Sequence, residues 1–232
     1  RASECVRSIS SMCVKTHISP NGSGIRRCMG KKGRFNYEER AAAARAAHQE
    51  IGRTFARLKN RNDEKDPATI AWKAAIARFR DALRLAYPGD FGEDIERLKA
   101  GDARGLEGVI RFLEADPMFF GSGYAKADLI RFINRMALTE HQADRLRTVA
   151  LAMVDRRASQ EFRRYCRLAA KVNHPGLREE LQVRAACRAP AVARRARRML
   201  AHVRRRPCAE RPGRENAPYA QRGRPRGPTD AG

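Results

Sequence analysis

The sequence has few aromatic residues and no long apolar run. Phe, Trp and Tyr make up 6% of its 232 residues. No stretch reaches the roughly 18 consecutive apolar residues typical of a transmembrane helix. Residues 1–35 also lack the continuous apolar segment of a secretory signal peptide. These absences predict no membrane span and favour a cytoplasmic location.

Motifs for catalysis or metal binding are missing as well. Cys13, His17 and Cys28 lack a fourth ligand and do not fit the spacing of a common zinc site. The segment from Gly24 to Lys32 has one residue too many between its glycines for a phosphate-binding loop. We therefore expect no catalytic residue, no cofactor and no metal, in a protein that is not an enzyme.

Cysteines are present without the pattern of a disulfide framework. A helical chain of this size without a secretory signal is expected to keep its thiols reduced. We expect Cys166 to be a core residue. The six cysteines stand at positions 5, 13, 28, 166, 187 and 208.

The residues that are abundant favour helices. Alanine and arginine dominate the sequence, and both suit helices better than strands. Hydrophobic residues make up 42% of the chain, which is enough for a core. The sequence therefore predicts an all-α fold.

Residues 36–87 show the pattern of a helical hairpin. Asn36 can cap a helix over residues 37–60, and Asp66 with Pro67 can start a second helix. Because the polar turn between the two helices is short, we expect them to pair antiparallel. A coiled-coil dimerisation element is the alternative. The apolar positions expected on the seam are Ala41, Ala44, His48, Ile51, Phe55, Leu58, Trp72, Ile76, Phe79, Leu83 and Ala86.

Residues 88–204 are expected to form a series of short helices. None of these helices is long enough to be stable alone in water, so each must bury an apolar stripe on a neighbour. The expected stripes are Leu106, Val109, Ile110 and Leu113; Leu129, Phe132, Ile133 and Met136; Ala143, Leu146, Ala150, Met153 and Val154; and Leu177, Leu181 and Val183.

Local signals mark where these helices begin. Thr139 and Gln142 fit a capping box, in which each side chain bonds the other residue's backbone amide. Ser122 and Ser159 are expected to cap two further helices. Prolines at positions 117, 175 and 190 are expected at helix starts.

The short paired helices, the prolines at their starts and the small loops resemble HEAT or armadillo repeats over about residues 103–204. The resemblance implies a stacked helical array that binds a protein or a nucleic acid on a concave face. A few helical-repeat proteins are DNA glycosylases, but no residue pattern in this sequence indicates one.

Positive charge is concentrated at the two ends of the chain. The formal net charge is +23, of which residues 1–35 carry +7 and residues 188–232 carry +10. Residues 1–35 have no helical period and are expected to be disordered, with residues 1–28 spurious if translation begins at Met29. Residues 205–232 are rich in Pro, Gly and Arg and are expected to be a disordered basic tail. Such ends favour polyanionic partners.

Two basic elements are candidate nucleic-acid-binding sites. Arginines crowd the last predicted helix, residues 190–204, where they either form a solvated outer face or contact phosphates. The segment from Arg222 to Pro225 resembles the core of an AT-hook, which implies insertion of its arginines into the minor groove of A·T-rich DNA. The candidate residues are Arg194, Arg195, Arg197, Arg198, Arg222, Arg224 and Arg226.

The sequence therefore predicts a helical hairpin followed by a HEAT-like helical array, with disordered basic termini. The leading functional hypothesis is a non-catalytic module that binds a protein partner through its helical surface. The alternative is a DNA- or RNA-associated protein that uses the basic last helix and the Arg-rich tail. A helical-repeat enzyme acting on nucleic acid is the third hypothesis.

Overall fold

The structure, a computed structural model, describes residues 35–156 and 161–205. These residues form nine α-helices and one 3₁₀ turn and contain no strand, which confirms the all-α prediction. None of these helices combines the length and apolar character needed to cross a membrane. The elements are α2 (Tyr37–Phe55), α3 (Pro67–Leu85), α4 (Phe91–Lys99), η1 (Ala103–Gly105), α5 (Leu106–Ala115), α6 (Ser122–Ile133), α7 (Glu140–Arg156), α8 (Phe162–Lys171), α9 (Pro175–Ala185) and α10 (Pro190–Arg204).

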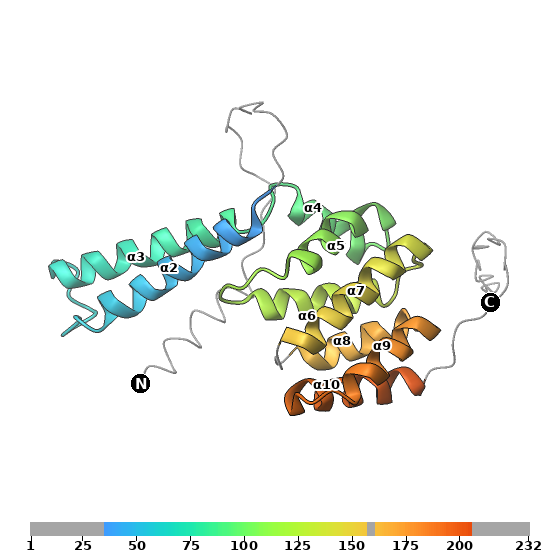
Figure 1. The fold of residues 1–232 in the computed structure, drawn as a ribbon. Helices are drawn as coiled ribbons and strands as arrows, with labels where there is room; N and C mark the ends of the chain where they lie inside the picture. The colour runs from blue at the N-terminus through green and yellow to red at the C-terminus, as the bar shows by residue number, and fades with distance from the viewer. Residues whose placement is uncertain (1–34, 157–160, 206–232) are drawn as a thin grey trace, which may run out of the picture.

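Helices α2 and α3 form the predicted hairpin and project away from the other helices (Figure 1). Asn36 Oδ1 accepts a hydrogen bond from the Glu39 amide at 3.1 Å, and Asp66 Oδ1 accepts one from the Ala68 amide at 3.1 Å. Both predicted caps are therefore confirmed. Helix α2 ends at Phe55 and not at Asn60. The backbone tightens to i→i−3 hydrogen bonds at Arg57 and Leu58, and the Asn60 side chain accepts from the Asn62 amide in the turn that follows.

The hairpin has a small core of its own at its middle. Ile51, Ala75 and Phe79 are buried there. The His48 ring packs 5.2 Å from the Phe79 ring and 4.8 Å from the ring of Phe120, which lies in the loop after α5. His48 is thus a packing residue of the seam, as expected from its position in the heptad.

The remaining helices alternate between two layers. Helix α5 packs on α7 and α7 on α9, while α6 packs on α8 and α8 on α10 (Figure 1). Each helix of one layer also contacts the next helix of the chain in the other layer, as in the pairs α5 with α6, α7 with α8, and α9 with α10. The resemblance to HEAT repeats stays a prediction.

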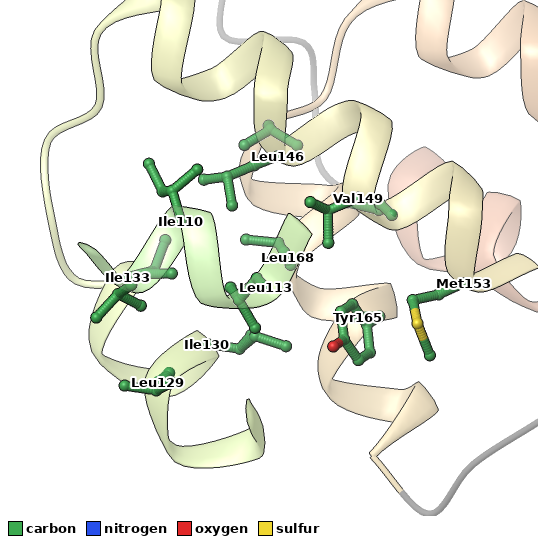
Figure 2. Packing of buried hydrophobic residues seen from close by; sticks show 14 of the residues in the cluster. Ile110, Leu113, Leu129, Ile130, Ile133, Leu146, Val149, Met153, Tyr165 and Leu168 are labelled. Carbon is green, nitrogen blue, oxygen red and sulfur yellow. The ribbon is translucent and has the colours of Figure 1, made fainter. Parts of the chain in front are cut away.

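One hydrophobic core joins the two layers (Figure 2). Cys166 lies in it as predicted, and burial raises the pKa of its thiol to about 11. Val183 was expected in a stripe with Leu177 and Leu181, but its side chain is 69% exposed. It stands two residues after Leu181, about 200° around the helix, and therefore faces solvent. The predicted residues that are buried include Leu106, Val109, Ile110, Leu113, Leu129, Ile133, Met136, Ala143, Leu146, Ala150, Met153 and Val154.

The local helix-start signals are confirmed in α7, α9 and α10. Thr139 Oγ1 accepts from the Gln142 amide at 3.2 Å, and Gln142 Oε1 accepts from the Thr139 amide at 3.0 Å. Helices α9 and α10 begin at Pro175 and Pro190. The expected cap at Ser159 lies outside the described residues.

The prediction of a helix starting at Pro117 is wrong. Helix α5 ends at Ala115, Asp116 adopts a left-handed backbone with φ of 45°, and α6 begins only at Ser122. Ser122 is not the cap of α6 either, because Gly121 precedes the helix with φ of 83° and Ser122 Oγ accepts from the Phe119 amide at 3.3 Å. The chain instead forms a loop over residues 116–121.

A buried ion pair explains this loop. Lys126 is fully buried, and its Nζ donates to Asp116 Oδ1 at 2.5 Å and to the Pro117 carbonyl at 2.8 Å. Arg156, at the end of α7, also donates to Asp116 Oδ2 at 3.1 Å. A buried ammonium requires such acceptors, and a helix starting at Pro117 would not present them in this arrangement. The same loop holds the hairpin, since Arg45 Nη1 of α2 donates to the Met118 carbonyl at 2.7 Å.

Candidate functional site

Helices α6, α8 and α10 enclose a pocket of about 450 Å³ on one side of the array. Five arginines line it, and no acidic side chain does. We call it the arginine pocket. Its lining residues are Arg131, Asn134, Arg135, Arg164, Arg167, Ala170, His202 and Arg205.

The amphipathic pattern of the three helices positions these side chains. On α6 the buried face includes Leu129, Ile130 and Ile133, so Arg131 projects from the other side, and Arg135 follows in the turn after the helix. On α8 the buried face carries Phe162, Tyr165, Cys166, Leu168 and Ala169. The arginines of the pocket are therefore the solvent side of helices whose other side builds the core.

The positive charge of the pocket is largely uncompensated. Arg131 Nη2 lies 3.4 Å from Asp128 Oδ1 in an exposed pair on α6. Among residues 35–156 and 161–205, no carboxylate pairs with the other four pocket arginines. Four arginines consequently line the pocket without an acidic partner from this part of the chain, which makes the pocket attractive to an anion.

One polar atom in the lining has no partner. The side-chain oxygen Oδ1 of Asn134 is buried and accepts no hydrogen bond in the part of the chain that the structure describes. Leaving a buried acceptor unsatisfied costs about 1–3 kcal/mol. A bound molecule that donates a hydrogen bond would remove this cost.

A second, smaller pocket adjoins the first. It has a volume of about 380 Å³ and shares Arg164 with the arginine pocket. We call it the Tyr124 pocket, because the Tyr124 side chain in its lining is 65% exposed. Its other lining residues are Gly121, Gly123, Ala127 and Glu161.

The arginines predicted on the last helix do not line either pocket. Arg195 binds the end of α7: its Nε donates to the Val154 carbonyl at 2.6 Å and its Nη2 to the Asp155 carbonyl at 3.3 Å. Arg195 is therefore a structural residue.

The other three described candidates have separate environments. Arg194 is exposed. Arg197 Nε donates to the Ala193 carbonyl of its own helix at 3.2 Å, and the Arg198 guanidinium lies 6.0 Å from the centroid of the Phe162 ring. The tail candidates Arg222, Arg224 and Arg226 lie outside the described residues.

Sequence reasoning missed the arginines that the fold brings together. These arginines lie on, or just after, three helices and are separated by up to 74 positions in the chain: Arg131, Arg135, Arg164, Arg167 and Arg205. The available signal was that Arg131, Arg164 and Arg167 fall opposite the apolar stripe of their helix. No sequence pattern stated that α6, α8 and α10 would be neighbours.

The described residues contain no cluster of three or more His, Cys, Asp or Glu side chains that could hold a metal ion. The chain matches no protein-family model, no curated protein and no solved structure. The function must therefore be inferred from the geometry of the two pockets.

Proposed function

We propose that this protein binds nucleic acid, and that the arginine pocket holds phosphates of the backbone. The observation that carries this proposal is the convergence of five arginines in a lining without a carboxylate. A guanidinium presents several donors in a plane that matches phosphate oxygens, and it stays charged at all physiological pH values. Phosphate contacts of this kind supply most of the affinity of non-specific nucleic-acid binding.

Two further properties support the proposal. The net charge of +23 attracts a polyanion to the whole chain, so the pocket acts within a favourable long-range field. The lining of the arginine pocket also contains no carboxylate that would repel a phosphate. A cytoplasmic location belongs to the same proposal.

Charge-matched triple variants of the full chain test this function. Arg135→Gln, Arg164→Gln and Arg167→Gln together remove pocket arginines, while Arg40→Gln, Arg57→Gln and Arg78→Gln remove the same charge from the hairpin. The second set consists of exposed side chains without an ion pair to the described residues, so both triples should fold.

Binding of short labelled DNA is measured by fluorescence anisotropy at one salt concentration. Each exposed charge contact contributes about 0.5–1 kcal/mol, so loss of three contacts should weaken binding about 10- to 150-fold in the pocket triple. The hairpin triple should stay close to the wild type. Equal weakening by both triples would show that net charge alone, and not the pocket, holds the nucleic acid.

Binding of a protein partner is the second candidate function, and the hairpin favours it. Ile70 is 55% exposed and Leu85 is 53% exposed on α3, in a hairpin that projects from the two-layer array (Figure 1). Exposed apolar side chains on a projecting element are typical of a protein contact. If a partner copurifies with the protein, Ile70→Asp with Leu85→Asp should release it, whereas the pocket triple should retain it.

A further inference from the structure

We infer that the nucleic acid is single-stranded and that one unpaired base enters the Tyr124 pocket, stacked on the Tyr124 ring. This inference rests on the proposed function, because the arginine pocket must hold the neighbouring phosphates. It adds a base-binding site to a phosphate-binding site. Three observations carry it: the shared Arg164, the exposed Tyr124 ring and the single carboxylate of Glu161.

The two pockets are neighbours. Arg164 lines both of them, so a chain bound in the arginine pocket lies beside the Tyr124 pocket. On α6, Tyr124 and Arg131 are separated by seven residues, which is two helical turns or about 10.5 Å along the axis. Seven residues also return to nearly the same side of the helix, so Tyr124 and Arg131 lie along one edge of α6.

Tyr124 provides a surface for stacking. Its side chain is 65% exposed, and its pocket neighbours Gly121, Gly123 and Ala127 are small. A Cβ atom added at Gly121 would meet nothing within 4 Å, so this side of the pocket is open. Stacking on an aromatic ring requires a base that is not already stacked and paired in a duplex, so a tyrosine beside a phosphate site selects single strands.

The charges assign different parts of the nucleotide to the two pockets. No carboxylate lines the arginine pocket, whereas Glu161 lines the Tyr124 pocket. A carboxylate repels a phosphate but accepts hydrogen bonds from the amino group of a base, as acidic residues do from cytosine. Gly123 leaves room for it, because a Cβ atom there would stand 3.0 Å from Glu161 Oε2. Glu161 therefore makes the Tyr124 pocket better suited than the arginine pocket to the amino group of a base.

Full-length Tyr124→Ala and Tyr124→Phe variants test the stacking contact against labelled single-stranded and duplex DNA. Loss of one stacked base should weaken single-strand binding by Tyr124→Ala at least about fivefold, and Tyr124→Phe should stay within about twofold of the wild type. Duplex binding should change by less than about twofold in both variants. Because Tyr124 is mostly exposed, the alanine variant should fold normally.

Single-stranded oligo(dC) and oligo(dT) test the base contact. The wild type should prefer oligo(dC), because thymine has no amino group, and Glu161→Ala should remove the preference. The base-binding site is refuted if Tyr124→Ala binds single strands as the wild type does, or if oligo(dC) and oligo(dT) bind equally. In that case the phosphate-binding function still stands provided that the arginine triple weakens binding. Absence of nucleic-acid binding in the wild type would refute both.

Discussion

The interaction of Lys126 with Asp116 shows how a single buried charge determines local structure. The Lys126 side chain has no exposed surface, so its ammonium must be paired within the protein. Asp116, ten residues before Lys126, pairs with its ammonium group. Arg156, at the end of α7, pairs with the other carboxylate oxygen of Asp116. No local pattern around Lys126 indicates this burial, because Asp116 and Arg156 are brought together with it only by the tertiary fold. That is why the sequence predicted a helix start at Pro117 and the structure has a loop.

Replacing Asp116 by Asn should be strongly destabilising. Asn tolerates the left-handed backbone of this position, so the change tests the charge and not the conformation. Removing one member of a buried ion pair costs about 3–5 kcal/mol, because the other charge stays buried. We expect urea denaturation of Asp116→Asn to give a free energy of unfolding lower by about 3 kcal/mol.

The matched control for this change is Asp81→Asn. Asp81 pairs with Arg84 on the surface of α3, and both side chains are mostly exposed. A pair of this kind contributes at most about 1 kcal/mol. If Asp116→Asn were no more destabilising than Asp81→Asn, the ion pair at Lys126 would not hold the loop.

Helix starts are predictable from the sequence where a capping side chain bonds a backbone amide of the same first turn. Asn36, Asp66 and the Thr139 capping box needed only their own first turn. Ser122 does not cap α6, because its hydroxyl oxygen accepts a hydrogen bond from the backbone amide of Phe119 in the preceding loop. Val183 was expected in the buried stripe of its helix, but it stands about 200° around the helix from Leu181 and is exposed. The angular spacing of residues along a helix is enough to predict this exposure.

Adjacent arginines on α10 should differ in their effect on stability. Arg195 binds the last carbonyls of α7, whereas Arg194 is exposed. Hydrogen bonds from a charged group contribute about 1.5–3 kcal/mol, and partial exposure reduces this to about 1 kcal/mol here. Thermal or urea denaturation should show Arg195→Ala destabilised by about that amount and Arg194→Ala unchanged within about 0.5 kcal/mol. Equal stability of the two variants would mean that Arg195 does not anchor α10 to α7.

At the scale of the whole molecule, the functional surface arises from helix order. The sequence predicted an all-α chain with a hairpin, and it located most core residues through their periodicity. It placed positive charge on the last helix but not in a pocket, because the pocket requires α6, α8 and α10 to be neighbours in one layer. Adjacency of helices that are not consecutive depends on tertiary packing, which a periodic pattern does not encode.

This packing also separates two kinds of arginine. Arg195 is used inside the fold, while Arg135, Arg164 and Arg167 are left facing an open pocket. Amino-acid composition alone does not distinguish these two kinds of arginine. The second group is proposed to contact phosphates directly.

The salt dependence of binding tests that claim most directly. The association constant of the full chain for single-stranded DNA is measured over a range of salt concentrations, for the wild type, the pocket triple and the hairpin triple. Each lost phosphate contact lowers the slope of log K against log salt by about 0.7 for a single strand, so the pocket triple should lose about 2 in slope. The hairpin triple should keep the wild-type slope. The same slope for both triples would contradict the claim, because the pocket arginines would then touch no phosphate.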